Sequence, residues 1–175
     1  GKFFKPKDVI IAETGTSSIG IVDIPLPEKS IFVSQILWGS IGWTVGSTLG
    51  AARNLGLNLF IGDGSLQLTV QELSVMLRHG LKPIIFVLNN SGYTIEVRPT
   101  GANTIFSASY TARSANGRVA RRRDGDSALS QSYTVKTKDE LEALLATPLF
   151  AEAGKMQLVE MMMPKHDAPW SNRRS

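Results

Sequence analysis

The stretch IGDGSLQLTVQELSVMLRHGLKPIIFVLNNSGYTIE, residues 61–96, decides the fold of this 175-residue chain. Gly62-Asp63-Gly64 lies near its start and Asn89-Asn90 near its end, and 24 residues (65–88) separate the two groups. That distance suits one helix followed by one strand. Because ligands bind at the carboxyl ends of strands in an open α/β sheet, we expect Asp63 and Asn90 to lie at that edge.

The residues between these two groups carry the patterns of both elements. Leucine or valine recurs at helical spacing at positions 66, 70, 73 and 77, which predicts a helix over 65–79. We expect Ser65 to cap this helix and Gly80 to end it. Positions 84–88 are all apolar and predict a short strand that is buried on both faces.

The side chains at the two ends offer oxygen ligands to a hard cation. Asp63 carries a carboxylate, Asn90 an amide oxygen, and Gly92 allows a backbone carbonyl to turn inward. Such a set suits Mg²⁺ that is shared with a phosphorylated ligand. Gly64 and the first amides of the predicted helix can face the phosphates. Each group taken singly is also an ordinary turn sequence, but their combination across one strand–helix–strand unit favours a binding site.

Four segments of the chain resemble one family of enzymes. They are AETGTSSIG (12–20), SQILWGSIGW (34–43), IGDGSLQLTVQE (61–72) and VLNNSGYTIE (87–96). Together they resemble the C-terminal, diphosphate-binding domain of the pyruvate decarboxylases, the fungal ones most closely. The similarity covers 8–96 and resumes at 131–169. It implies an α/β fold with a mostly parallel sheet and helices on both faces, and it implies thiamin diphosphate and Mg²⁺ as cofactors.

The resemblance also assigns roles to positions of this chain. It implies Asp63, Asn90 and Gly92 as metal ligands. It gives Gly39 a backbone carbonyl that receives the aminopyrimidine, and it makes Ile41 an apolar wedge that keeps the cofactor bent. The turn after the first strand would lie near the cofactor, although a plain strand-to-helix turn explains it equally well. The implied cofactor-binding residues are Thr14, Gly15, Thr16, Gly39, Ser40, Ile41, Gly62, Asp63, Gly64, Ser65, Asn90, Gly92, Tyr93, Thr94 and Ile95.

Glu96 is the catalytic residue that the resemblance implies. In the decarboxylases this glutamate acts in decarboxylation and protonates the enamine, which is the work of a general acid. Its presence favours simple decarboxylation over ligation. The implied reaction is decarboxylation of a 2-oxo acid, with pyruvate as the predicted substrate. Indolepyruvate and phenylpyruvate decarboxylases share these motifs and stay open as alternatives.

The family needs a second domain that these 175 residues do not contain. A glutamate on the pyrimidine-binding domain of a partner subunit, in a homodimer or homotetramer, starts cofactor activation. We therefore expect this chain to be inactive by itself. A non-catalytic relic, or a diphosphate-binding module without turnover, is the alternative from another class of protein.

Further elements are expected on both sides of the central unit. Strands are predicted at 9–12, 31–34, 57–61, 133–136 and 156–163. Gly42, Gly46 and Gly50 are spaced four apart and are expected on one face of a helix. Thr137 and Glu140 form a capping box. The methionines at 161–163 are expected in the core.

The domain boundaries follow from composition. Residues 1–7 are interpreted as the remnant of a linker, 8–169 as the cofactor-binding domain, and 170–175 as a tail. Residues 97–130 are atypical, because they are rich in serine, alanine and arginine and show no sustained period. A basic binding loop and an error in the reading frame of the source gene both explain them, and we favour the second. That explanation predicts poor order over 97–130.

Charge and hydropathy exclude two classes of function. The net charge of +4 comes from residues 97–130, which contain six arginines and two aspartates. The charges of the remaining 13 basic and 13 acidic residues cancel. Nucleic-acid binding would need a basic face across the domain. Residues 31–52 carry no charge, but their serines, threonines and glycines dilute the run below a membrane span. Cysteine is absent, which is compatible with a cytoplasmic enzyme.

Overall fold

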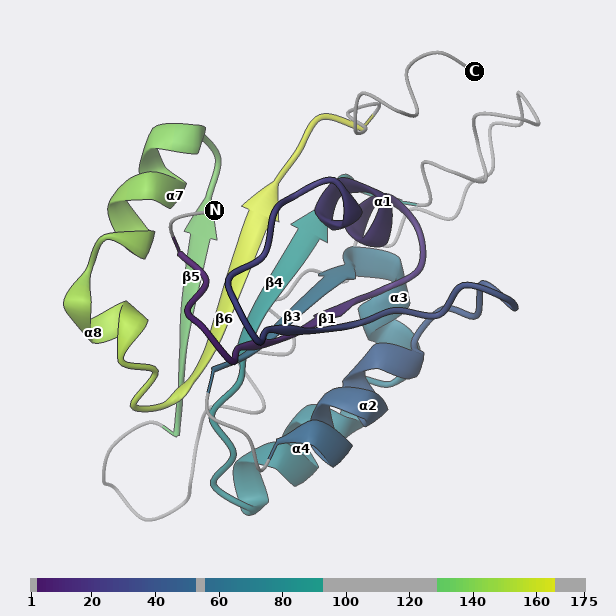
Figure 1. Ribbon diagram of the computed structural model, residues 1–175, viewed down its shortest axis with the longest axis horizontal. Coiled ribbons are helices and arrows are strands. Elements are labelled where there is room, and N and C mark those ends of the chain that lie inside the picture. The colour runs from purple at the N-terminus through teal and green to yellow at the C-terminus, as the bar shows by residue number, and fades with distance from the viewer. Residues whose placement is uncertain (1–2, 53–55, 93–128, 166–175) are drawn as a thin grey trace.

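The computed structural model describes residues 3–52, 56–92 and 129–165, which form one sheet flanked by helices (Figure 1). Its strands follow the order β2-β1-β3-β4-β6-β5, and every pairing is parallel. The α/β class and the parallel sheet predicted from the sequence are therefore confirmed. The strands are β1 (Val9–Ala12), β2 (Ile31–Val33), β3 (Leu57–Gly62), β4 (Ile84–Asn89), β5 (Ser130–Val135) and β6 (Met156–Met162).

Helices cover both faces of this sheet. Side chains of α2 (Trp43–Ala51), α3 (Asp63–Leu68) and α4 (Gln71–Arg78) join one apolar cluster. The opposite face packs against α1 (Thr16–Val22), α7 (Lys138–Leu145) and α8 (Pro148–Ala151). Alternate residues of each strand supply the two clusters, as the period of two in a strand requires. In Figure 1, α2 and α4 lie together on one side of the strands, and α7 and α8 lie beside β5 and β6.

Aromatic rings fill the core on the α7–α8 side. Phe60 and Phe86 stack with their centroids 4.6 Å apart, and Phe150 meets Phe86 edge-on at 6.4 Å. Phe3 and Phe4 pack into the same group, 5.9 Å from Phe86 and Phe60 respectively. The segment before β1 therefore contributes apolar side chains to the core.

The single helix predicted over 65–79 is wrong. The structure has two helices, α3 and α4, with Thr69 between them in a non-helical conformation (φ −136°). Its hydroxyl donates a hydrogen bond to the backbone oxygen of Gly42 at 2.6 Å. Gly62, not Ser65, is the N-cap of α3, and it provides no side-chain cap. A tertiary hydrogen bond thus interrupts a sequence whose apolar period is continuous.

The expectation of three glycines on one helical face is also wrong. Gly42 precedes α2 as its N-cap and has a φ of +83°, a left-handed conformation that favours glycine. A Cβ there would lie 2.8 Å from the Cβ of Leu68. Gly46 and Gly50 lie within α2, where an added Cβ would meet nothing within 4 Å. Of these three glycines, only Gly42 lies so close to another segment that a side chain would not fit.

Some of the remaining predictions for the chain agree with the structure and others do not. The Thr137–Glu140 capping box is present at the start of α7. Met161 packs against the core, but the side chain of Met162, at the end of β6, is 37% exposed, so the expectation of a core position is wrong for Met162. No helix in the part of the chain that the structure describes is long and apolar enough to cross a membrane. Of the atypical stretch, 97–128 lie outside the described residues, whereas Ser130 begins β5.

Candidate functional site

The turns that follow β1, β3 and β4 meet at the carboxyl edge of the sheet, where the loop before α2 joins them. They surround a cavity of about 110 Å³. The chain switches sides at this edge: β1 has β2 on one side and β3 on the other, which is where open α/β sheets bind ligands. The cavity is lined by Thr14, Gly15, Thr16, Ser17, Gly39, Ile41, Gly62, Asp63, Gly64, Ser65, Leu88, Asn90 and Gly92.

Most of the predicted site residues are thus brought together by the fold. Ser40 does not line the cavity, but its backbone oxygen accepts a hydrogen bond from the Thr14 hydroxyl at 3.0 Å. Ser17 and Leu88 line the cavity without having been predicted, although both lie within the segments that carry the family resemblance. The predicted residues Tyr93, Thr94, Ile95 and Glu96 lie outside the described residues.

Asp63 is the most unusual group in this cavity. Its side chain is buried, and neither of its carboxylate oxygens has a hydrogen-bond partner. Burial raises the pKa of this carboxyl from its ordinary 3.8 to about 6, and the Glu160 carboxylate adds to the rise. The backbone amides of Asp63, Gly64 and Gly92 are near enough to oppose the rise in pKa, although none forms a hydrogen bond of good geometry. Buried carboxylates are ordinarily paired, so this one fits a site that a cation completes.

The donor set around Asp63 suits one kind of cation. Within 3–52, 56–92 and 129–165 no cluster of three or more histidine, cysteine, aspartate or glutamate residues could hold a metal ion. A metal that needs several protein ligands of those types does not fit. Mg²⁺ fits better, because it binds through one or two carboxylates and takes its other oxygens from amides, water and phosphate. Asn90 and Gly92 border the same cavity and can supply such oxygens.

A chain of hydrogen bonds shapes the turn that carries Asn90. Glu160, buried on β6, accepts a hydrogen bond from Asn89 Nδ2 at 2.7 Å. Asn89 Oδ1 in turn accepts one from the Ser91 amide at 3.1 Å, and Ser91 has a φ of +62°. Asn89 therefore holds the turn in the conformation that presents Asn90 and Gly92 to the cavity. One signal that could have pointed to Glu160 is its place as the lone charge inside the strand MQLVEMM.

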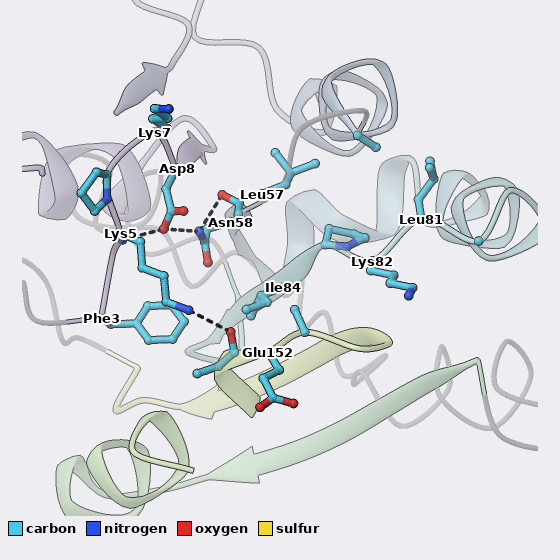
Figure 2. Close-up of a pocket in the computed structure, with 17 residues that line it drawn as sticks. Phe3, Lys5, Lys7, Asp8, Leu57, Asn58, Leu81, Lys82, Ile84 and Glu152 are labelled. Atoms are coloured by element: carbon cyan, nitrogen blue, oxygen red, sulfur yellow. Dashed lines mark hydrogen bonds between the residues drawn. The ribbon is translucent and has the colours of Figure 1, made fainter. Parts of the chain in front are cut away.

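A larger cavity lies at the opposite edge of the sheet (Figure 2). It measures about 570 Å³ and borders the first residues of β3 and β4. Its buried carboxylate is already engaged, because Asp8 Oδ2 accepts hydrogen bonds from the Lys5 amide at 2.9 Å and from Asn58 Nδ2 at 3.4 Å. Figure 2 shows these bonds, and Lys5 reaching a backbone oxygen beside Glu152. Only the smaller cavity combines an unpaired buried carboxylate with the ligand-binding edge, so it is the candidate site.

Three apolar side chains near this site face solvent. The exposed fractions of Ile36, Leu37 and Trp38 are 91%, 88% and 85%. They precede Gly39 in the loop that borders the cavity, and Ile41 on the other side of Gly39 is 41% exposed. Contiguous exposed apolar residues mark interaction surfaces.

Comparison with known proteins identifies similar sequences and folds. Residues 13–161 match a family described as "Thiamine pyrophosphate enzyme, C-terminal TPP binding domain". Pyruvate decarboxylase isozyme 3 of Saccharomyces cerevisiae is 44% identical over 177 residues, which cover 97% of this chain and 31% of the yeast protein. Pyruvate decarboxylase of Aspergillus terreus is 43% identical, with coverage of 98% and 31%. The chain thus spans about a third of the length of these relatives.

Solved structures give the same fold at lower identity. Benzoylformate decarboxylase from Polynucleobacter necessarius superposes with a TM-score of 0.69 at 19% identity, over 95% of this chain and 32% of that one. The 4-hydroxybenzoylformate decarboxylase of Rhodococcus jostii RHA1 gives 0.70 at 18% identity, over 91% and 30%.

Proposed function

Because the chain belongs to the thiamine pyrophosphate enzymes, as their C-terminal TPP-binding domain, we propose that it forms the diphosphate- and Mg²⁺-binding part of a 2-oxo-acid decarboxylase acting on pyruvate. The unpaired carboxylate of Asp63 at the cavity is the observation that carries this proposal. The identity to pyruvate decarboxylases supports the choice of pyruvate.

Different residues around the cavity bind different parts of the cofactor in this proposal. Asp63, Asn90 and Gly92 hold Mg²⁺ through a carboxylate, an amide and a backbone oxygen. Gly39 and Ile41, on the loop before α2, receive the pyrimidine end. Thiamin diphosphate, when bound, supplies the electron sink that loss of CO₂ from a 2-oxo acid requires. Thr16, Gly64 and Ser65 would hold the phosphate groups, because their backbone amides and the two hydroxyls can donate hydrogen bonds to phosphate oxygens.

Glu96 supplies the proton in this proposal. It follows Asn90 by six positions in the sequence, and the family resemblance implies that its carboxylate acts on the substrate side of the cofactor. A carboxylic acid there can protonate the reacting carbon after CO₂ leaves. The proposal for Glu96 rests on the sequence motif, since the residue lies outside the described part of the chain.

A second subunit completes the site. The family resemblance places a pyrimidine-binding domain opposite this one, and the exposed Ile36, Leu37 and Trp38 beside the cavity provide an apolar surface for it. The chain by itself then binds the cofactor weakly and turns over no substrate. A diphosphate-binding module without turnover is the second candidate function, since the cavity around Asp63 needs only a diphosphate and Mg²⁺ to be filled.

Calorimetry on the 175-residue chain tests the binding proposal. Thiamin diphosphate should bind in the presence of Mg²⁺ and not in its absence. Asp63→Ala should abolish this binding, because it removes the single charged ligand, and Asn90→Ala should weaken it. Asp23→Ala is the matched control, since Asp23 is exposed at the end of α1. Unchanged Mg²⁺-dependent affinity in Asp63→Ala would remove the basis for the site.

Turnover is tested in a full-length chain that includes the missing domains. Glu96→Gln should leave thiamin diphosphate affinity unchanged and reduce the release of CO₂ and aldehyde strongly. Each factor of ten in rate corresponds to about 1.4 kcal/mol of transition-state stabilisation. A Glu96→Gln enzyme that works at the unmodified rate would show that Glu96 has no catalytic role.

A further inference from the structure

A further buried carboxylate, that of Glu13, lies close to the site without lining the cavity. Glu13 follows β1 directly, and its side chain is completely buried. The proposed function gives it no task, and it contributes no atom to the cavity wall. A buried charge needs hydrogen-bond donors to offset its loss of water, so its partners show what it holds.

Glu13 joins the end of β1 to the start of α2. Its Oε1 accepts a hydrogen bond from the Thr14 amide at 2.9 Å. Its Oε2 accepts two more, from the Gly42 amide at 3.0 Å and from the Thr44 hydroxyl at 2.6 Å. Gly42 is the N-cap of α2 and offers no side chain for capping. Glu13 therefore caps α2 from a position 29 residues earlier in the chain.

Two further hydrogen bonds fix the same loop. The Thr14 hydroxyl donates to the Ser40 backbone oxygen at 3.0 Å, beside Gly39. On the other side, the Thr69 hydroxyl donates to the Gly42 backbone oxygen at 2.6 Å. Residues 39–42 are thus held between the end of β1 and the break between α3 and α4. Gly39 and Ile41, which border the cavity, belong to this clamped segment.

The charge of Glu13 suits this task better than a neutral side chain would. Hydrogen bonds to a carboxylate are stronger than those between neutral groups. The N-terminus of a helix also favours an anion. Glutamine keeps the size of the side chain but offers one accepting oxygen instead of two. It cannot accept from Thr14 on one side and from Gly42 and Thr44 on the other.

We propose that Glu13 is a positioning residue that fixes Gly39 and Ile41 against the cavity and so determines affinity for the part of the ligand beyond its diphosphate. The fixing of residues 39–42 is a property of the ligand-free chain. The effect on ligand affinity rests on the proposed function. Asp63, Asn90 and Gly92 lie on other turns, so binding of a bare diphosphate with Mg²⁺ should depend on Glu13 far less than binding of the whole ligand does.

Hydrogen exchange of the ligand-free chain tests the fixing of the loop. In Glu13→Gln the Gly42 amide should exchange at least tenfold faster, while the amide of Leu59 in the central strand β3 stays protected. Thr44→Val should show a smaller effect, and Thr44→Ser, which restores the hydroxyl, should behave as the parent chain. Glu28→Gln is the control, because Glu28 is exposed. Unchanged protection of Gly42 in Glu13→Gln would overturn the proposal.

Two probes, each with Mg²⁺, test the effect on affinity. Glu13→Gln should weaken thiamin diphosphate binding at least tenfold and leave inorganic pyrophosphate binding within about twofold of the parent. An equal loss for both probes would indicate general damage and contradict the positioning role, as would no loss for either. A parent chain that binds neither probe would contradict the proposed function, and hydrogen exchange would still decide whether Glu13 fixes the loop.

Discussion

The unpaired Asp63 carboxylate sets the pH dependence of the ligand-free chain. Its pKa is about 6 in the folded protein against an ordinary value of 3.8, so the folded state binds more protons between these values. Stability therefore falls as pH rises from about 4 to 6 and stays lower above that range. A difference of roughly two pKa units corresponds to a loss on the order of 3 kcal/mol.

Asp63→Asn should remove this loss. We expect the ligand-free variant to be more stable than the parent at pH 7.5, by up to about 3 kcal/mol, and nearly equal to it at pH 4. Urea unfolding at both pH values measures the difference. Asp23→Asn, an exposed site, should change neither. A variant that is less stable than the parent at pH 7.5 would contradict the assignment of an unpaired charge.

Glu160 on β6 also affects the pKa of Asp63, although β4 lies between β6 and the strand β3 that leads to Asp63. Its negative charge helps to raise the pKa of Asp63, so Glu160→Gln should lower that pKa toward its ordinary value. Glutamine keeps an oxygen that can accept from Asn89, so the turn should persist. Carboxyl ¹³C shifts followed by NMR report the titration directly. An unchanged Asp63 pKa would mean that Glu160 acts through hydrogen bonding alone.

At the scale of elements, the junction at Gly42 connects three segments. Its amide is bound by Glu13, its carbonyl oxygen by Thr69, and its left-handed conformation brings it against Leu68. The loop before α2 and the break between α3 and α4 therefore depend on each other. A substitution in one of these two segments should therefore change the conformation of the other, although 27 residues separate Gly42 from Thr69.

Two glycine substitutions separate this junction from the helix that follows it. Gly42→Ala should destabilise the chain by about 1–3 kcal/mol, because alanine is strained at a positive φ and its Cβ would meet Leu68. Gly46→Ala is the matched control within α2, where space is open, and it should be neutral or stabilise by up to about 1 kcal/mol. Urea unfolding compares them. Equal effects at the two positions would contradict a special role for Gly42.

The sequence predicted the strands well and the helices less well, for a physical reason. Strands such as Ile84–Asn89 are buried on both faces and read as apolar runs that end in polar residues. The break at Thr69 left no trace, because Leu66 and Leu73 pack on the same core on either side of it. It depends on a tertiary hydrogen bond, which local periodicity does not record.

In the candidate site, too, some residues could be predicted from the sequence and others could not. Residues in motifs, such as Asp63 and Asn90, were found because their spacing reflects strand ends. Glu13 and Glu160 were not, because Glu13 is a single charge at the end of a buried strand and Glu160 a single charge within one. Gly42 lies 29 residues from Glu13 and Asn89 lies 71 residues from Glu160. Only the fold shows which donors surround them.

At the scale of the whole molecule, the apolar surface of Ile36, Leu37 and Trp38 is the main feature that the chain leaves uncovered beside its site. The proposed function assigns this surface to the pyrimidine-binding domain of a second subunit. In the isolated chain these side chains face water, and such surfaces associate.

We expect the isolated chain to self-associate through this surface. Replacing Leu37 and Trp38 by serine should shift the chain toward monomer in sedimentation velocity, without changing its unfolding midpoint. Val22→Ser is the control, since Val22 is 66% exposed at the end of α1, away from the 36–38 surface in sequence. If the Val22 variant and the double variant sediment alike, the surface has no part in association.

The position of β6 has a consequence for synthesis of the chain. It is the last strand in the sequence, yet it lies between β4 and β5 and supplies the single pairing that β5 makes among the described strands (Figure 1). While the ribosome still holds residues 156–162, the nascent chain can assemble β1 to β4 but must keep an edge of β4 open. Unpaired edges recruit strands from other chains. β6, the last of the described strands to be synthesised, therefore closes the sheet, and any delay in its synthesis prolongs the period in which neighbouring nascent chains can pair with β4.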